Sequence, residues 1–220
     1  MIRLWLCTFS LFTLLLLGGC SATTPENEAT EVTKASLTVS AAAQLQLLKD
    51  AQESYEKELY TVARENFEKL RNSYPLGPYA EFAEIKIADS HYVQGQYSSA
   101  AAKYENFVKE HPASASLEYA LIMAARSFQL SNRGIGRDPS SLNRALEFYN
   151  RVITDFPLGV YKQDAAQFRI ETMVLLAQHE RKLLEYYRRN NSEAAYSSRL
   201  SEFKIRWKEL IRVGLVDPVD

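Results

Sequence analysis

The stretch SYPLGPYAEF, from Ser73 to Phe82, is echoed by DFPLGVYKQD, from Asp155 to Asp164. Each copy carries a Pro-Leu-Gly phrase, and proline next to glycine interrupts regular secondary structure. An interruption that recurs with nearly the same residues predicts that the segment between the interruptions recurs as well. Internal repeats are therefore the first hypothesis to test, because they decide the whole fold.

Three segments that lead up to a proline share one spacing. Each has a small residue, an aromatic or polar-aromatic residue one turn later, an apolar residue after it, and then the proline. The sets are Ala63, Phe67, Leu70 and Pro75; Ala100, Tyr104, Phe107 and Pro112; and Ala145, Tyr149, Val152 and Pro157. A small side chain lets a second helix cross closely, the larger residues fill the contact, and the proline ends the helix. This pattern is the second-helix signature of a tetratricopeptide (TPR) repeat, a pair of antiparallel helices.

Helical periodicity continues from Ala41 onward, without a convincing strand alternation. We therefore expect an all-α fold over residues 41–220, an α-solenoid of TPR-like helix pairs with about four repeats, the last one irregular. Gly77 belongs to the first Pro-Leu-Gly turn, and Gly95 occupies an inter-helix turn. The interval between equivalent alanines is 37 residues and then 45, and the additional residues fall between Leu130 and Ser141. This insertion is either a tolerated surface loop or a loop that contacts a partner.

The C-terminal part predicts a less regular pair. A first helix is expected from about Tyr161 to Gln178, followed by a long helical stretch broken at Asn190–Asn191. The later stretch carries an apolar stripe at helical spacing: Tyr196, Leu200, Phe203, Trp207 and Leu210. Either this stripe closes the last repeat, or Trp207 also marks a docking surface.

The first twenty residues read MIRLWLCTFSLFTLLLLGGC. A positive Arg3, an apolar run over residues 4–17 and small residues before Cys20 are typical of a secretory signal, too short to span a bilayer as a mature helix. The ending LGGC resembles a bacterial lipobox, so we expect residues 1–19 to be removed and Cys20 to carry lipid. The alternative is an ordinary signal peptide with a chance cysteine.

Residues 20–40 are polar, small and without periodicity, which predicts a flexible tether between the lipid and the fold. Cys7 would be removed with the signal and Cys20 acylated, so no thiol would remain for a disulfide, a metal or a nucleophile. Ser21 follows the cysteine, where an aspartate typically marks inner-membrane retention. The lipobox resemblance therefore implies the outer membrane, with the protein facing the periplasm.

No pattern in the sequence indicates catalysis. His91, His111 and His179 have no second ligand at metal-binding spacing, and there is no glycine-rich phosphate loop or nucleophile elbow. We therefore expect no enzyme activity, no metal and no cofactor. The 26 basic residues nearly balance the 27 acidic ones, which argues against a nucleic-acid partner.

Helical repeats bind extended peptides or partner domains along the face formed by their first helices. Counting fourteen residues beyond the three prolines gives Asp89, Arg126 and Glu171, and counting seventeen gives Tyr92, Gln129 and Val174. The charged set is either a line of ion pairs between repeats or a polar floor for a bound peptide, with Tyr55 and Tyr92 adding apolar contact. The candidate partner-binding residues are Tyr55, Asp89, Tyr92, Arg126, Gln129, Glu171 and Trp207.

At this point a family resemblance becomes specific. A lipobox, a polar tether, YPLGPY (Tyr74–Tyr79) and RDP (Arg137–Pro139) ahead of an FY helix resemble the BamD family, also called ComL or YfiO. Its members are lipoprotein subunits of the machine that assembles outer-membrane β-barrels, and the resemblance covers Cys20 to about Arg189. It implies a periplasmic scaffold of about five TPR units.

The resemblance also implies partners. The C-terminal part would bind a BamA-like β-barrel subunit, other accessory lipoproteins would be contacted, and the N-terminal repeats would handle unfolded outer-membrane proteins. This chain departs from the family in one respect, because no proline-terminated unit follows Tyr187. The segment from Tyr196 to Leu210 would then have to contact the barrel subunit. The alternatives are another TPR envelope adaptor, for cell-wall synthesis or division, and a lipid-anchored hydrolase, for which every motif is missing.

Overall fold

The structure is a computed structural model that describes the backbone of residues 25–219 and the side chains of residues 39–219. The chain divides into two compact units, Met1–Ala41 and Ala42–Asp220. The expected signal peptide and Cys20 lie outside the described residues. The expected tether differs from expectation in one respect, because residues 25–40 have helical rather than irregular backbone. A helix can form there without an amphipathic pattern, and proline is tolerated at its first position.

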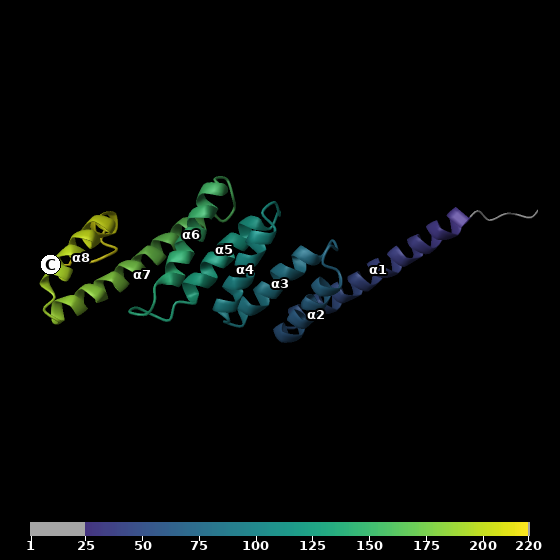
Figure 1. The fold of residues 1–220 in the computed structure, drawn as a ribbon, viewed down its shortest axis with the longest axis horizontal. Helices are drawn as coiled ribbons and strands as arrows, with labels where there is room; N and C mark the ends of the chain where they lie inside the picture. Colours follow the sequence, from purple (N-terminus) through teal and green to yellow (C-terminus); the bar gives the residue numbers. More distant parts are fainter. Residues whose placement is uncertain (1–24, 220) are drawn as a thin grey trace, which may run out of the picture. The chain divides into compact units, whose positions relative to one another are not determined.

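Every regular element in the described part of the chain is a helix, which confirms the all-α prediction. The helices are α1 (Pro25–Glu56), α2 (Tyr60–Ser73), α3 (Ala80–Val93), α4 (Tyr97–Glu110), α5 (Leu117–Leu130), α6 (Ser140–Asp155), α7 (Lys162–Arg189), α8 (Glu193–Arg206) and α9 (Lys208–Arg212). Figure 1 shows α2 to α8 following one another side by side, and each packs on the next. The pairs α1/α2, α3/α4, α5/α6 and α7/α8 are the expected four repeats. No helix among the described residues is both long and apolar enough to span a bilayer.

The repeat signature lies in the seams between helices. The small, aromatic and apolar positions upstream of each proline are all buried, and the three alanines have no exposed surface. Helices α2, α4 and α6 each end two residues before their proline, and the next helix begins five residues after it, at Ala80, Leu117 and Lys162. This identical geometry confirms that each proline-containing turn closes one helix pair and begins the next.

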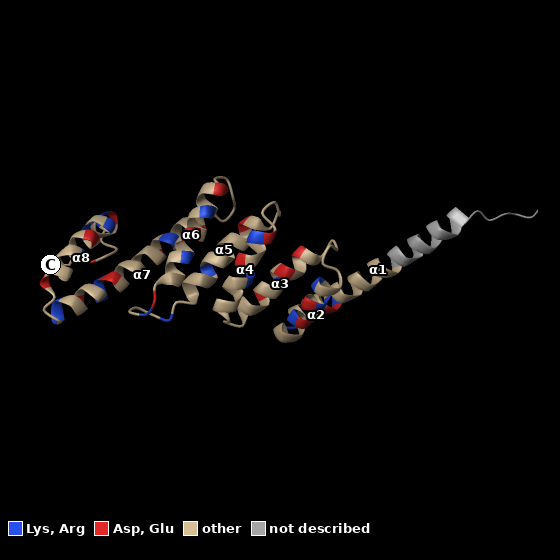
Figure 2. Cartoon of the chain, in the orientation of Figure 1, with Lys and Arg blue, Asp and Glu red and all other residues tan. Residues whose placement is uncertain are grey.

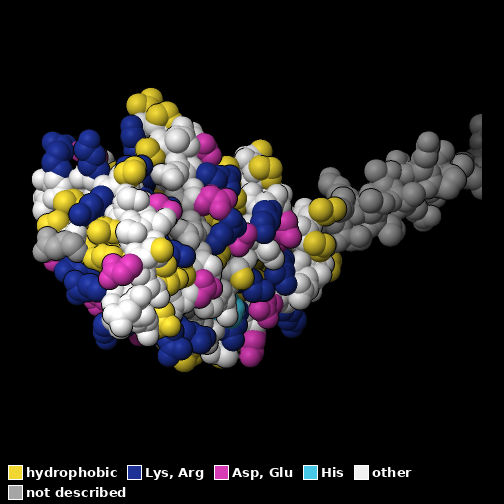
Figure 3. All heavy atoms as spheres, turned by 60° about the vertical axis from the view of Figure 1, so that its left-hand side comes forward, with side chains coloured by type: hydrophobic (Ala, Val, Ile, Leu, Met, Phe, Trp, Pro, Cys, Tyr) yellow, Lys and Arg dark blue, Asp and Glu magenta, His cyan; other side chains and the backbone are white. Residues whose placement is uncertain are grey.

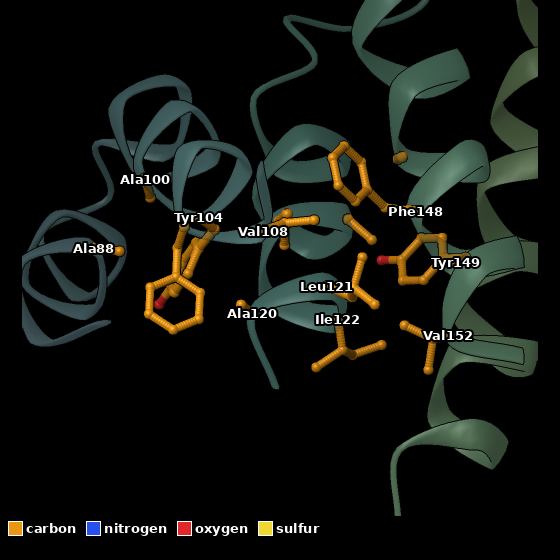
Figure 4. Packing of buried hydrophobic residues seen from close by; sticks show 14 of the residues in the cluster. Ala88, Ala100, Tyr104, Val108, Ala120, Leu121, Ile122, Phe148, Tyr149 and Val152 are labelled. Atoms are coloured by element: carbon orange, nitrogen blue, oxygen red, sulfur yellow. The ribbon is translucent and has the colours of Figure 1, made fainter. Parts of the chain in front are cut away.

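The buried residues form three clusters along the array. One joins α1, α2 and α3 through residues such as Phe67, the second spans α3 to α7, and the third joins α6, α7, α8 and α9. Figure 4 shows the middle cluster, with Tyr104 lying between Ala88 and Ala120, and Tyr149 pointing its hydroxyl group toward α5. Burial is therefore distributed between neighbouring helices, as in a solenoid, and not gathered in one central core.

The insertion between α5 and α6 lies against the following repeat. Gly134 and Gly136 have φ of 108° and 92°, values that favour glycine. The Nζ of Lys182 donates to the carbonyl of Ile135 at 3.3 Å, and the N–H of Gly136 donates to Nδ1 of His179 at 3.3 Å. The loop thus contacts α7 directly.

The last pair differs from the predicted boundaries. Helix α7 does not end near Gln178 but continues to Arg189, because no proline or glycine interrupts this stretch. The predicted break at Asn190–Asn191 is confirmed, and Asn191 has a φ of 50°. The apolar stripe is also interrupted, since Trp207 lies between α8 and α9.

Candidate partner-binding surface

Of the expected line of ion pairs between Asp89, Arg126 and Glu171, the structure contains the pair between Arg126 and Glu171. Nη1 of Arg126 on α5 lies 3.7 Å from Oε2 of Glu171 on α7, and it donates to Oε1 of Gln129 at 2.8 Å. The guanidinium of Arg126 also lies over the ring of Phe168, 4.4 Å from its centroid. Oε1 of Gln129 accepts a second bond, from the hydroxyl of Tyr149 at 2.7 Å. Arg126 is thus part of a polar network that joins α5, α6 and α7.

Asp89 is buried and engaged within the chain. Its Oδ1 accepts hydrogen bonds from the hydroxyls of Tyr104 at 2.6 Å and Tyr119 at 2.9 Å, and its Oδ2 accepts one from Nζ of Lys86 at 2.9 Å. Asp89 is only 5% exposed, and Arg126 is not among its partners in the described part of the chain. Asp89 therefore does not form the expected ion pair with Arg126, and its oxygens are already taken by three donors within the chain.

The charge of Asp89 affects the surrounding tyrosines. Burial, supplemented by the nearby Asp89 carboxylate, raises the pKa of Tyr55 to about 12. The same two causes raise the pKa values of Tyr104 and Tyr119 well above 10. Burial also raises the pKa of Tyr149, although Arg126 opposes the shift. The four phenols are therefore neutral hydrogen-bond donors at physiological pH.

Two of the expected aromatic contacts lie beside this network. Tyr55 and Tyr92 are both half-buried, and each makes an edge-on contact with a tyrosine at the start of the next helix. Nζ of Lys86 lies 4.8 Å from the ring centroid of Tyr55. Tyr55 also lines a small pocket of about 160 Å³ with Phe67, Phe82 and Lys86. Of the expected aromatic pair, Tyr55 is thus the one placed at a hollow of the surface.

Trp207 lies in the core of the last repeat. It is 4% exposed and packs in the C-terminal cluster with Phe203 and Leu210. Its Nε1 donates to Oε2 of Glu180 on α7 at 2.8 Å. The structure therefore favours the first of our two alternatives, in which the stripe closes the last repeat, since a buried indole offers almost no surface for docking.

Side chains of one repeat also bind the turn that follows the next helix, and the repeat signature did not indicate these contacts. Oε1 of Glu118 accepts the N–H of Tyr161 at 2.9 Å, and Oε2 of Glu81 accepts the hydroxyl of Ser114 at 2.6 Å. A Cβ added to Gly159 would lie 2.1 Å from Glu118, and one added to Gly77 would lie 2.5 Å from Gln44. Gln44, Glu81 and Glu118 are each 37 residues apart, which is the alanine interval, so the repeat spacing could have identified them.

The same turns expose apolar side chains. Leu76 and Leu158, the leucines of the two Pro-Leu-Gly phrases, are 99% and 98% exposed, and Val160 is 80% exposed. They are therefore available to a partner, but they take no part in the seam between the repeats.

A hollow of the described surface lies between α6, α7 and α8, and no sequence pattern indicated it. We call it the α6–α8 pocket; it has a volume of about 650 Å³. Its lining includes Leu146 on α6, Met173 and Arg169 on α7, and Arg206 and Trp207 at the end of α8. Helix spacing alone does not reveal such a pocket, because it depends on how far α8 covers α7.

Three side chains of types that bind metal ions come together in the fold, although Glu84 is far from the other two in the sequence. Side-chain ligand atoms of Glu84, Glu110 and His111 lie within 4.8 Å of one another, at the junction of α3 and α4. Nε2 of His111 is 2.7 Å from Oε2 of Glu84, so a hydrogen-bonded pair accounts for this contact. Glu110 is exposed, and an exposed acidic group beside such a pair is common without a metal.

The charges of the array do not form a basic stripe. Lysine and arginine alternate with aspartate and glutamate from α2 to α8 (Figure 2). On the face shown in Figure 3, both signs are interspersed and hydrophobic side chains form small patches between them. This distribution suits contacts with proteins better than contacts with a polyanion.

Comparison with known proteins supplies the family. Residues 40–214 match the family model YfiO, described as an outer membrane lipoprotein, and this range includes all four helix pairs from residue 40 onward. No curated protein matches the chain.

Proposed function

The chain belongs to the YfiO family of outer membrane lipoproteins, and from this premise we propose that it is a lipid-anchored scaffold of outer-membrane β-barrel assembly. In this role it would hold the barrel-forming subunit, contact accessory lipoproteins and receive unfolded outer-membrane proteins. The observation that carries the proposal is the family match over an array of four stacked helix pairs. Stacked helix pairs present long surfaces for other proteins, and their seams leave side chains free at the turns.

The anchor is the first part of the proposal. The lipobox-like LGGC places Cys20 at the position where acylation is expected, and several acyl chains on one residue hold a protein firmly at a bilayer. A Cys20→Ser variant should move from the outer-membrane fraction to the soluble periplasmic fraction and should no longer incorporate labelled palmitate. A variant that stays in the membrane fraction would contradict lipid anchoring at this residue.

The partner of the C-terminal part is the second element of the proposal. Phe203, Trp207 and Leu210 of the expected contact segment are buried, so a contact there has to use the outer side of α8. Ile205 on this side is 78% exposed. We expect the barrel subunit to cover Ile205 and the neighbouring outer residues of α8.

The test is a pull-down from detergent-solubilised membranes with the tagged full-length chain. Co-purification of a large β-barrel protein with periplasmic domains is expected, and Ile205→Glu should reduce its yield severalfold. Val160→Glu is the matched control, because Val160 is equally exposed but lies in the turn before α7. Recovery of peptidoglycan synthases in place of a β-barrel protein would contradict the proposal and would favour an adaptor of cell-wall synthesis.

A further inference from the structure

The α6–α8 pocket lies in the last, irregular part of the array. Helix α7 is 28 residues long, and α8 packs on its C-terminal half, where Leu184 and Phe203 are buried together. Over the middle of α7 the pocket lies between α6 on one side and the end of α8, at Arg206 and Trp207, on the other. Pro139, the last residue of the insertion before α6, forms part of the rim.

The pocket continues into a groove. A second hollow of about 180 Å³ shares His179 and Leu183 with the α6–α8 pocket and extends along α7 to Tyr186. Tyr186 is 57% exposed, and the inserted loop closes the other side at Gly136. The two hollows meet at His179 and Leu183 and together follow α7 from Arg169 to Tyr186, which fits an extended chain segment better than a compact small molecule.

The floor of the α6–α8 pocket is apolar. Leu146, Met173 and Leu183 are half-buried there, so their remaining surface faces the opening, and Leu176 lies beneath. Such a floor gains free energy when it covers apolar side chains of a ligand, at about 25 cal/mol per Å² removed from water. The occupant must therefore carry at least one aliphatic or aromatic side chain.

The charges of the pocket select for an acid. Glu180 is occupied within the chain, because one of its oxygens pairs with Arg206 and the other accepts Nε1 of Trp207 at 2.8 Å. Arg169 is different: its Nη1 donates to the neutral Oδ1 of Asn150 at 3.3 Å. Its Nε is buried and has no hydrogen-bond partner among the described residues. The rest of the Arg169 side chain is half-buried and lines the pocket, and no ion pair with a carboxylate of the described residues neutralises its charge. A carboxylate is the strongest partner for a guanidinium in such a position.

We propose that this groove binds an extended peptide segment of a partner protein, with an acidic side chain on Arg169 and an adjacent apolar side chain on the floor formed by Leu146, Met173 and Leu183. The proposal rests on the scaffold function and adds a binding site to it. Nucleic acid and free phosphate fit less well, since the acidic Glu180 belongs to the same lining and the apolar floor offers no hydrogen-bond donor to a phosphate group. The Arg169 guanidinium and the floor act together, so neither an apolar peptide nor an acidic peptide alone has the full affinity.

The test is a selection with the purified full-length chain against a phage-displayed library of random peptides. The enriched peptides are expected to carry Asp or Glu next to Leu, Ile or Phe. The most enriched peptide, labelled with fluorescein, is then titrated by fluorescence anisotropy. Arg169→Gln should weaken its binding at least about tenfold, as expected for the loss of a charge-assisted hydrogen bond. Replacing the acidic residue of the peptide by its amide should weaken binding to the wild type similarly and have little further effect on Arg169→Gln.

Two further variants separate the site from general effects. Asn143→Trp, at an exposed position of the rim, should block binding by filling the pocket without altering the core. Arg71→Gln makes the same charge change on α2, outside the groove, and should bind like the wild type. The proposal would be overturned if the selected peptides were not enriched in acidic residues. It would also be overturned if Arg169→Gln and Asn143→Trp bound the peptide as tightly as the wild type does. A wild-type dimer that Asn143→Trp dissociates would assign the groove to a second copy and also overturn it. The peptide experiments use the purified chain alone, so a negative result in them does not contradict the proposed contact with the barrel subunit, which the pull-down tests separately.

Discussion

At the scale of single residues, the aromatic position of the repeat, four residues after the alanine, contributes both a buried ring and, where it is tyrosine, a hydrogen bond. Tyr104 and Tyr149 occupy this position, and both fill a seam with the ring while the hydroxyl donates to a polar side chain of a first helix, Asp89 or Gln129. Phe67 occupies the same position without a hydroxyl. The ring is therefore required by the repeat, whereas the polar partner is particular to each seam.

Asp89→Asn should destabilise the fold by about 1–3 kcal/mol, since the amide loses the charge that Lys86 and the two tyrosine hydroxyls stabilise and one bond partner must be lost. The free energy of unfolding, measured by urea denaturation and circular dichroism, checks this value. Asp155→Asn on the exposed end of α6 is the control and should change it by less than about 0.5 kcal/mol. Equal effects would show that the Asp89 network contributes nothing to stability.

The tyrosine cluster also predicts a pH dependence. The folded-state pKa of Tyr55 is about 12 and those of Tyr104 and Tyr119 are raised in the same direction. Above pH 10 the unfolded chain loses phenol protons that the folded chain keeps, so the free energy of unfolding should fall as the pH rises through the window from 10 to about 12. Urea denaturation from about pH 8 to about pH 11 tests this, and Tyr104→Phe should flatten the decline. Stability that stays level across this range would contradict the assignment.

At the scale of elements, the turns between repeats are fixed by side chains from the preceding repeat. Glu118 on α5 accepts the N–H of Tyr161 just before α7, and its carboxylate occupies the space above Gly159. In the previous turn, Glu81 on α3 accepts the side-chain hydroxyl of Ser114. A glycine or small residue at this position leaves room for the carboxylate, which then holds the start of the next first helix.

Gly159→Ala should therefore destabilise the protein by about 1 kcal/mol, because the new methyl group displaces Glu118 and breaks its bond to Tyr161. In a Glu118→Ala background the same substitution should cost much less, because no carboxylate remains to displace. Thermal or urea denaturation of the four proteins of this double-mutant cycle measures the coupling. Additive effects would show that Gly159 acts independently of Glu118.

At the scale of the whole array, each helix packs on its neighbours in the chain, and three clusters of buried residues divide the stabilising contacts between them. In such an array, stability is approximately a sum of contributions from units and their interfaces. A defect in the C-terminal cluster should therefore remain local.

Phe203→Ala should remove about 3–5 kcal/mol from the C-terminal cluster and increase amide hydrogen exchange in α8 and the second half of α7. Protection in α2 to α5 should remain close to that of the wild type. Hydrogen exchange followed by mass spectrometry resolves these segments, and Ile205→Ala, on the exposed side of the same helix, is the control. A uniform increase along the chain would show that the array unfolds as one cooperative unit.

The spacing of small, aromatic, apolar and proline residues predicted which helices pair, where α2, α4 and α6 end and which of their residues are buried, because these depend on local periodicity and chain breaks. The sequence also pointed to the family that the comparison then supported. The pairing of polar side chains could be known from the three-dimensional structure alone. Asp89 lies against two tyrosines and not in a ladder, Trp207 is buried, and an open pocket lies beside Arg169. Such outcomes depend on the angles and lengths of neighbouring helices, since these set the distances between side chains far apart in the chain.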